Sequence, residues 1–244
     1  VSCNYSYNII QHIFLTFYII MINVYKSKAI KKYLEHDDVH DRNPNFKNHG
    51  ITTRKHMVIC GKSGSGKTNF IVNLLNQMSD TFAQIYIFTA MIDEPIYRML
   101  DEMSDNIHVM QISQVIAYDK LPDQRNNKLI IFDDFITQPK PVLKMIETYA
   151  ILSRKIGCSC LFLVQNYFSL STAIRNQASY IVLLKNSNKK NLNMISAQMG
   201  GVLDVKALST IIDDATKQQF DVCIVDLLDS TKMLRKNFDQ YYTV

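Results

Sequence analysis

Short apolar runs and amphipathic stretches alternate along the chain from residue 57 onward. The apolar runs have the length of buried strands, and the stretches between them repeat apolar residues at the spacing of one helix face. We expect strands over residues 57–61, 84–89, 106–110, 128–134, 159–165, 180–185 and 220–226. We expect helices over residues 67–78, 94–103, 141–155, 192–199 and 205–212. Continuous apolar strands separated by helices predict an α/β fold, with a mostly parallel sheet that helices cover on both faces.

The chain before residue 57 has a different pattern. Residues 9–25 are mostly apolar, but polar residues interrupt them and they fall short of the ~20 residues that span a membrane. Basic residues follow this stretch and none precedes it, which argues against a secretory signal. A short helix over residues 28–36 and a polar linker come next. We therefore expect an N-terminal extension and linker over residues 1–56 and one domain over residues 57–244.

Two features of this extension stay open. Residues 1–20 precede the first methionine, Met21, and fit three interpretations: translated upstream sequence without function, an interfacial or anchoring helix, or a packed element. His36 and His40 have the spacing of two metal ligands on one helix face. No further Cys or His follows at ligand spacing, so a solvated loop is the favoured interpretation.

Composition and charge exclude little beyond disordered and repetitive chains. The sequence is 47% hydrophobic and 20% charged, as in ordinary globular proteins. Its net charge of +5 permits an anionic partner without indicating one. The five cysteines form no C-x-x-C pair, and Cys60, Cys160 and Cys223 fall inside apolar runs, which is typical of buried thiols in a reducing compartment.

The strongest chemical signal is a glycine-rich sequence between the first expected strand and the first expected helix of the domain. It consists of Gly61, Lys62, Ser63, Gly64, Ser65, Gly66, Lys67 and Thr68, a complete G-x-x-x-x-G-K-T phosphate-binding loop. The glycines allow a tight turn that points N–H groups at phosphate oxygens, and the helix adds its positive dipole end. We expect Lys67 to contact the β- and γ-phosphates of ATP and Thr68 to offer a hydroxyl to Mg²⁺.

The expected strand over residues 128–134 ends in Asp133 and Asp134. Strands commonly end in Asp at a turn, but ligands of open α/β sheets collect at the carboxyl ends of the strands, where the phosphate loop also lies. We therefore expect Asp133 in the Mg²⁺ shell and Asp134 as the group that polarises the attacking water.

The next expected strand ends in Gln165, with Asn166 after it. An amide at that strand tip can hydrogen-bond both the γ-phosphate and the attacking water. The alternative is an ordinary polar residue at the end of a strand. We expect Gln165 to act as the sensor of hydrolysis.

Together these elements mark phosphate-loop NTPases that have an additional strand between the phosphate loop and the acidic strand. The run SRKIGCSCLFLVQNYF at residues 153–168, followed by AIRNQA at 173–178, resembles the poxvirus-type genome-packaging ATPases of large cytoplasmic DNA viruses. Related enzymes occur in virophages and Maverick-like transposons, within the FtsK–HerA superfamily. Two departures from the family pattern are Arg154-Lys155, where Arg-His is usual, and Asp133-Asp134, where Asp-Glu is frequent.

The resemblance implies a homo-oligomeric ring in which an arginine from one subunit completes the ATP site of the next. Arg154 and Arg175 are the candidates, and a solvated helix end or a helix cap is the plain alternative for each. It also implies non-specific contact with double-stranded DNA, for which the basic loop with Lys185, Lys189 and Lys190 is a candidate. A solvated basic loop is the favoured interpretation of these three lysines. A capsid or membrane component is a further expected partner, in a virion or a virus factory in the host cytoplasm.

The expected function is that of an ATP-hydrolysing DNA translocase that packages a viral or virus-like genome into a capsid. Another ring NTPase, such as a helicase or a conjugative DNA-transfer motor, is the alternative among enzymes. A small-molecule kinase fits less well, because it would lack the Gln165 strand tip. From a different class, a nucleotide-gated scaffold would bind ATP without hydrolysing it.

Overall fold

The computed structural model describes residues 42–122, 126–185 and 188–243. They belong to one compact unit, Val39–Val244. The candidate anchor at residues 1–20, the expected helix at 28–36 and the His36–His40 pair lie outside the described residues. In this described part of the chain, no helix combines the length and the hydrophobicity of a membrane span.

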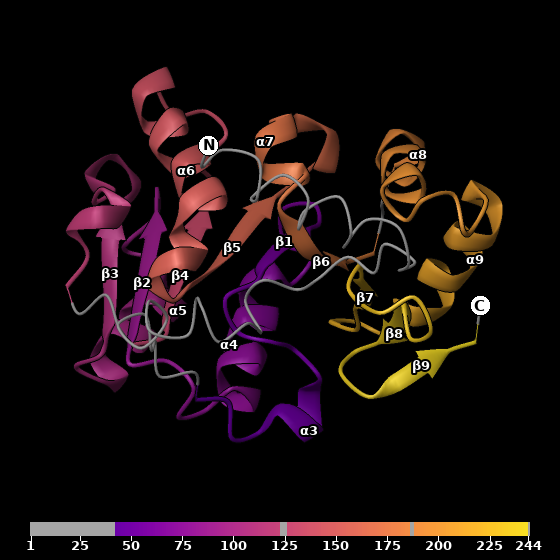
Figure 1. The fold of residues 1–244 in the computed structure, drawn as a ribbon, viewed down its shortest axis with the longest axis horizontal. Helices are drawn as coiled ribbons and strands as arrows, with labels where there is room; N and C mark the ends of the chain where they lie inside the picture. The colour runs from indigo at the N-terminus through magenta and orange to yellow at the C-terminus, as the bar shows by residue number, and fades with distance from the viewer. Residues whose placement is uncertain (1–41, 123–125, 186–187, 244) are drawn as a thin grey trace, which may run out of the picture. The chain divides into compact units, whose positions relative to one another are not determined.

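The described strands form one sheet of nine, in the order β3-β2-β4-β5-β1-β6-β7-β8-β9 (Figure 1). Their bounds are β1 (His56–Cys60), β2 (Gln84–Thr89), β3 (Ile107–Gln111), β4 (Lys128–Asp133), β5 (Cys158–Val164), β6 (Ala178–Leu183), β7 (Cys223–Asp226), β8 (Leu234–Lys236) and β9 (Gln240–Tyr242). The first six are parallel, and β7, β8 and β9 join antiparallel at one edge. The predicted α/β fold with a mostly parallel sheet is confirmed.

The expected strands are confirmed with shifted ends, and two strands were not predicted. The expected strand over residues 220–226 was wrong at its start, because Phe220 takes a left-handed backbone and β7 begins only at Cys223. The strand expected over 128–134 ends one residue early for the same reason at Asp134. Strands β8 and β9 have three residues each, too few to show a periodic pattern.

The helices agree with the expected pattern except at their ends and in the shortest elements. They are α3 (Phe46–His49), α4 (Lys67–Gln77), α5 (Pro95–Met103), α6 (Lys140–Leu152), α7 (Thr172–Arg175), α8 (Lys189–Gln198) and α9 (Val205–Ala215). Helix α6 stops at Leu152, earlier than expected, because the chain tightens into a 3₁₀ turn and reverses at Gly157, where φ is 78°. Helix α8 begins three residues before the expected start, since the side chain of Asn188 caps it.

Helices cover both faces of the sheet, as expected. Residues of α4 and α5 share one buried cluster with the strand residues that point to one side, such as Ile59 and Ile131. Residues of α6, α8 and α9 share the other cluster with the alternate strand residues, such as Val58 and Phe132. Since successive side chains of a strand point to opposite faces, this alternation buries the central strands on both sides.

Strand β5 lies between β1, which precedes the phosphate loop, and β4, which ends in the acidic pair. Strand β5 is therefore the predicted additional strand. Cys60 at the end of β1 pairs with Val164, and Asp133 at the end of β4 pairs with Leu163. The phosphate loop, the acidic pair and Gln165 therefore all lie where parallel strands end, at the carboxyl end of the sheet.

The segment 42–55, which precedes β1, packs against this domain. Ile51 and His49 are buried. The backbone N–H of Thr52 donates to the Tyr180 hydroxyl at 3.1 Å, and the Asn45 amide donates to the Ser79 hydroxyl at 2.9 Å. These contacts tie the segment to strand β6 and to the end of α4.

Candidate ATPase site at the carboxyl ends of the strands

The loop Gly61–Thr68 joins β1 to α4, as the sequence predicts. Gly64 and Gly66 have φ angles of 72° and 102°, which disfavour any residue with a Cβ. Gly61 allows Leu184 to pack closely against the loop, since a Cβ on residue 61 would lie 2.9 Å from Leu184 Cβ. The loop thus depends on its glycines for backbone shape and for packing.

The Lys67 ammonium folds back over this loop. Lys67 Nζ donates to the carbonyl oxygens of Gly61 at 3.0 Å and Lys62 at 3.2 Å. These bonds hold the charge at the loop surface, where it can reach the terminal phosphates of a nucleotide.

Asp133 lies at the end of β4 with only 7% of its surface exposed. Its Oδ2 accepts a hydrogen bond from the Tyr97 hydroxyl of α5 at 2.5 Å. Burial raises the pKa of the Asp133 carboxyl, and the nearby negative charges of Asp134 and Glu94 raise it further. The hydrogen bond from Tyr97 and the charge of Lys67 act in the opposite direction.

Asp134 differs from Asp133 in both exposure and backbone. Its side chain is exposed and its φ is 49°, in the left-handed region. Asp tolerates this conformation better than most residues with a side chain. The reversal separates the two carboxylates into one buried and one accessible group.

These residues line one pocket of about 520 Å³, within the size range of ligand sites. Its lining consists of Ser63, Gly64, Gly66, Lys67, Thr68, Asn69, Met91, Glu94, Asp133 and Asp134. The structure therefore brings together the phosphate loop, the predicted metal ligands and the predicted water-activating acid.

The sequence analysis gave no role to several residues at this site, among them Tyr97, Met91 and Glu94. Tyr97 holds Asp133, and Met91 and Glu94 line the pocket beyond the end of β2. No local pattern marks them, because their roles depend on the pairing of β2 with β4 and on the packing of α5. A glutamate before Pro95 at the start of an expected helix is an ordinary helix-start signal.

The residues present fit a magnesium ion. Thr68 and Asp133 line the same pocket and offer a hydroxyl and a carboxylate, the hard oxygen ligands that Mg²⁺ takes. Asp134 and Glu94 add negative charge that raises the pKa of Asp133, and a divalent cation would neutralise this repulsion.

Gln165 lines a second pocket, which shares residues with the first. This pocket of about 470 Å³ is lined by Asp134, Met91, Gln165 and Asn166 among others. Because Asp134 and Met91 line both pockets, Gln165 at the end of β5 lies beside the first pocket but not in its lining.

The two candidate arginines lie away from this pocket. Arg154 belongs to the 3₁₀ turn before the first residue of β5, at the opposite edge of the sheet from the phosphate loop. Strand β5 has seven residues, so it separates Arg154 from this edge by on the order of 20 Å. Arg154 Nη2 donates to Gln177 Oε1 at 2.5 Å.

Arg175 donates to the Leu170 carbonyl and to Thr172 Oγ1, so its guanidinium is held by its own chain.

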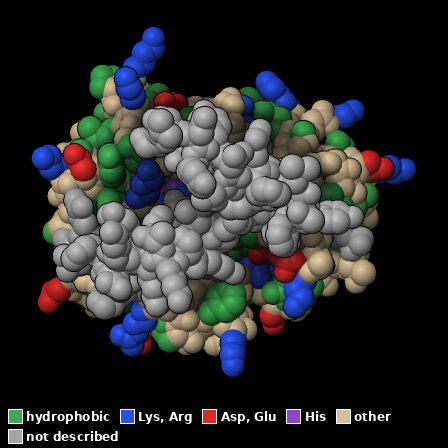
Figure 2. Space-filling view, in the orientation of Figure 1, with side chains coloured by type: hydrophobic (Ala, Val, Ile, Leu, Met, Phe, Trp, Pro, Cys, Tyr) green, Lys and Arg blue, Asp and Glu red, His purple; other side chains and the backbone are tan. Residues whose placement is uncertain are grey.

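The basic residues predicted in one loop are divided by the structure. Lys189 and Lys190 open α8, and Lys185 precedes it. Lys190 Nζ lies 4.2 Å from the centre of the Phe168 ring. In the view of Figure 2, the described Lys and Arg side chains are spread around the visible face and do not gather in one patch.

Comparisons with known proteins agree with this geometry. The family model described as the poxvirus A32 protein matches residues 44–231. A search of curated protein sequences finds no match.

Solved structures share the fold at low identity. B204, the DNA-packaging ATPase from Sulfolobus turreted icosahedral virus, has a TM-score of 0.52 and 16% identity, covering 77% of this chain and 98% of that chain. The genome-packaging NTPase B204 of Sulfolobus turreted icosahedral virus 2, in complex with AMPPCP, has a TM-score of 0.51 and 16% identity, with coverages of 75% and 96%. The pCW3 conjugation coupling protein TcpA with ATPγS has a TM-score of 0.52 and 14% identity, with coverages of 79% and 62%. These likenesses show a P-loop NTPase fold.

The matched range carries the chemistry described above. Residues 44–231 include the phosphate loop, both acids, Gln165 and the runs on which the sequence resemblance rests. They cover more than half of the 244-residue chain. The chain therefore belongs to the poxvirus A32 protein family of genome-packaging ATPases.

Proposed function

We propose that this chain hydrolyses ATP to move double-stranded DNA into a capsid. The observation that carries the proposal is the convergence of the phosphate loop, Asp133 and Asp134 on one pocket, in a family of packaging ATPases. A non-hydrolysing scaffold would need no buried metal ligand beside an exposed second acid. The DNA is bound without sequence preference, through contacts of basic side chains with its phosphates.

Each residue of the pocket has a proposed role. Lys67 binds the β- and γ-phosphates, while Thr68 and Asp133 hold Mg²⁺. When bound, the ion would neutralise charge that develops on the phosphates. Asp134, the exposed acid, accepts a proton from the attacking water as water adds to the γ-phosphorus and ADP leaves. Gln165, at the neighbouring strand tip, orients that water or senses the γ-phosphate.

A chain of contacts links the proposed sensor to the start of α8. Asn166, which follows Gln165, accepts a hydrogen bond from Asn188 Nδ2 at 3.1 Å. Asn188 caps α8, whose second residue, Lys190, lies over the Phe168 ring. A shift of the strand tip on loss of the γ-phosphate would therefore displace the lysines of α8. We propose that these lysines contact DNA phosphates.

The protein is proposed to act as a homo-oligomeric ring in a virion or virus factory in the host cytoplasm. The position of Arg154 supports this assembly, because a guanidinium at the far edge of the sheet cannot reach its own pocket. In a ring it can approach the pocket of the next subunit. A capsid or membrane component is the proposed docking partner of the ring.

The dependence of ATP turnover on DNA length tests the proposal. A translocating motor should hydrolyse more ATP per bound complex on long duplexes than on short ones, because each binding event allows more steps. We expect Lys67→Ala to abolish this turnover, and Lys144→Ala, on the exposed side of α6 and outside the lining of the pocket, to retain it. If single-stranded DNA stimulates ATP turnover and duplex DNA does not, a helicase or conjugative motor is favoured. If the protein hydrolyses no ATP with or without DNA, a scaffold is favoured.

A further inference from the structure

Phe220 combines an unusual backbone with an exposed ring. It lies between α9 and β7 with φ at 72°, and 50% of its surface is exposed. Positive φ is a genuine outlier for a bulky residue, and surrounding structure must hold it there. Such conformations cluster at ligand-binding sites.

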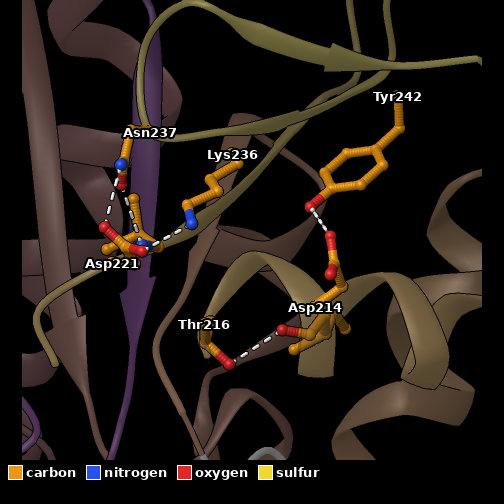
Figure 3. Close-up of polar contacts among 8 residues, drawn as sticks. Asp214, Thr216, Asp221, Lys236, Asn237 and Tyr242 are labelled. Carbon is orange, nitrogen blue, oxygen red and sulfur yellow. Dashed lines mark hydrogen bonds and ion pairs between the residues drawn. The ribbon is translucent and has the colours of Figure 1, made fainter. Parts of the chain in front are cut away.

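Polar contacts fix the chain immediately after Phe220 (Figure 3). Asp221 accepts from Lys236 Nζ at 2.7 Å and from Asn237 Nδ2 at 3.0 Å. The Val222 N–H donates to Asn237 Oδ1 at 3.1 Å, and the Asn237 N–H donates to the Val222 carbonyl at 2.9 Å. The segment after β8 therefore holds the strained position from one side.

The end of α9 is fixed on the other side of the same loop. Thr216 Oγ1 donates to the Ile212 carbonyl at 2.8 Å. The Tyr242 hydroxyl of β9 donates to Asp214 Oδ2 at 2.7 Å (Figure 3). The loop that carries Phe220 is thus anchored at both ends.

The Phe220 ring packs against the phosphate loop. A Cβ on Gly66 would lie 2.7 Å from Phe220 Cδ1 and 3.6 Å from Leu184 Cδ2. Gly66 is the residue before Lys67, so the ring touches the backbone where α4 begins. Phe220 is absent from the lining of the pocket that holds the acids.

We propose that the exposed face of Phe220 is the surface against which the adenine base of bound ATP packs. The inference rests on the proposed nucleotide site. The γ-phosphate must point toward Asp133 and Asp134, so the nucleoside must leave the phosphate loop in another direction. Among the described residues at the phosphate loop, Phe220 offers an exposed aromatic face outside the acidic pocket.

The chemistry of a phenyl ring sets the expected base preference. Stacking requires a π-face and no particular hydrogen bond, so adenine and guanine are both accepted. A purine covers more of the ring than a pyrimidine. The site should therefore bind ATP and GTP more tightly than CTP and UTP.

Two probes separate base contact from phosphate contact. Phe220→Ala should weaken ATP binding by about tenfold or more, the effect of losing one base-aromatic stack. Binding of inorganic tripolyphosphate, measured by competition with a fluorescent nucleotide, should be unchanged. Phe220→Tyr, which retains the ring, should bind ATP as the wild type does. The preference for purines should disappear in Phe220→Ala.

Phe220→Gly controls for the backbone, because glycine removes the ring and also relieves the positive φ. If the ring acts on the base, the Gly and Ala variants should lose equal ATP affinity, although the Gly variant is the more stable. Equal loss of tripolyphosphate binding in Phe220→Ala would overturn the inference, since the ring would then only support the phosphate loop. Unchanged ATP affinity would overturn it as well. A wild-type protein that binds neither probe would overturn the nucleotide site itself.

Discussion

The Tyr97 hydroxyl donates to the Asp133 carboxylate across 2.5 Å, and this bond joins α5 to the acidic end of β4. Both side chains are buried, with Tyr97 fully enclosed. Burial first, and then the charge of Asp133, raises the pKa of Tyr97 above its ordinary value, so the hydroxyl stays protonated and donates. Asp133 Oδ2 is therefore occupied by the Tyr97 hydroxyl, and we expect Oδ1 to be the oxygen that binds a ligand in the pocket.

Tyr97→Phe should increase the Mg²⁺ concentration needed for nucleotide binding by about tenfold, because partners that orient a metal ligand have effects of this size. The ring remains, so the core around it is preserved. A Mg²⁺ titration of fluorescent-nucleotide binding measures the change. Tyr149→Phe is the matched control, because Tyr149 is equally buried and its hydroxyl donates at 2.7 Å to the Ile116 carbonyl, outside the lining of this pocket. The same Mg²⁺ dependence in both variants would show that Tyr97 has no special role.

Asp133→Asn and Asp134→Asn should fail in different ways. Asp133 is the buried acid held by Tyr97, so its amide variant should first lose Mg²⁺-dependent nucleotide binding. Asp134 is exposed at the pocket, so its amide variant should bind Mg²⁺-ATP but hydrolyse it at least about 100-fold more slowly, the scale of general-base catalysis. Binding titrations and single-turnover assays separate the two effects. Equal loss of nucleotide affinity in both variants would contradict this division of labour.

The sequence predicts the part of the site that backbone chemistry encodes locally. The phosphate loop was predictable because Gly64 and Gly66 occupy conformations that other residues avoid. The position of Asp133 followed from an apolar strand with acids at its end. Tyr97 was not predictable, since nothing nearby in the chain indicates which side chain of α5 meets β4.

The failures at Phe220 and at the sheet edge have a different physical origin. Phe220 begins an apolar run, which predicts a strand. Its positive φ is supported by bonds from Asn237 and Lys236 to the two residues that follow it, and an apolar pattern does not indicate such contacts. Strands β8 and β9 are short and gain stability by extending an existing sheet. Such elements depend on tertiary context, which one sequence does not display.

Acid should destabilise the fold through His56. This histidine is buried, its Nδ1 accepts from the Cys160 N–H at 3.1 Å, and burial with the nearby charge of Arg154 lowers its pKa to about 3. The unfolded chain takes up the proton near pH 6.5, so stability is full above that pH and falls as the pH drops toward 3. The expected loss between pH 7 and pH 5 is about 2 kcal/mol.

Urea unfolding of wild type and His56→Asn at pH 7 and pH 5 measures this loss. The asparagine amide oxygen keeps an acceptor for the Cys160 N–H, but it does not titrate. The variant should therefore lose about 2 kcal/mol less stability than the wild type over this interval. Parallel losses in the two proteins would show that His56 does not carry the effect, since the other titrating groups are common to both.

The proposed action of Arg154 on a neighbouring subunit gives the final prediction. Arg154→Ala should bind ATP normally yet hydrolyse it at least roughly 10³-fold more slowly, because the guanidinium acts where charge develops on the leaving phosphate. Arg175→Ala should affect hydrolysis less, since both of its terminal nitrogens are bonded to its own chain, at the Leu170 carbonyl and at Thr172. In Arg154 the bond to Gln177 engages Nη2. The reverse order would assign the role to Arg175.

Mixed assemblies test whether Arg154 acts between subunits. Neither Arg154→Ala nor Lys67→Ala should hydrolyse ATP alone. In a mixed ring, some interfaces pair an intact phosphate loop from an Arg154→Ala subunit with an intact Arg154 from a Lys67→Ala neighbour, so part of the activity should return. The control is a double variant that carries both changes, mixed with one of the single variants. In each such mixture all subunits lack Arg154 or all lack Lys67, so no interface is intact and no activity should return. If the first mixture stays inactive while subunit exchange is confirmed by fluorescence transfer, Arg154 does not complete the site of its neighbour.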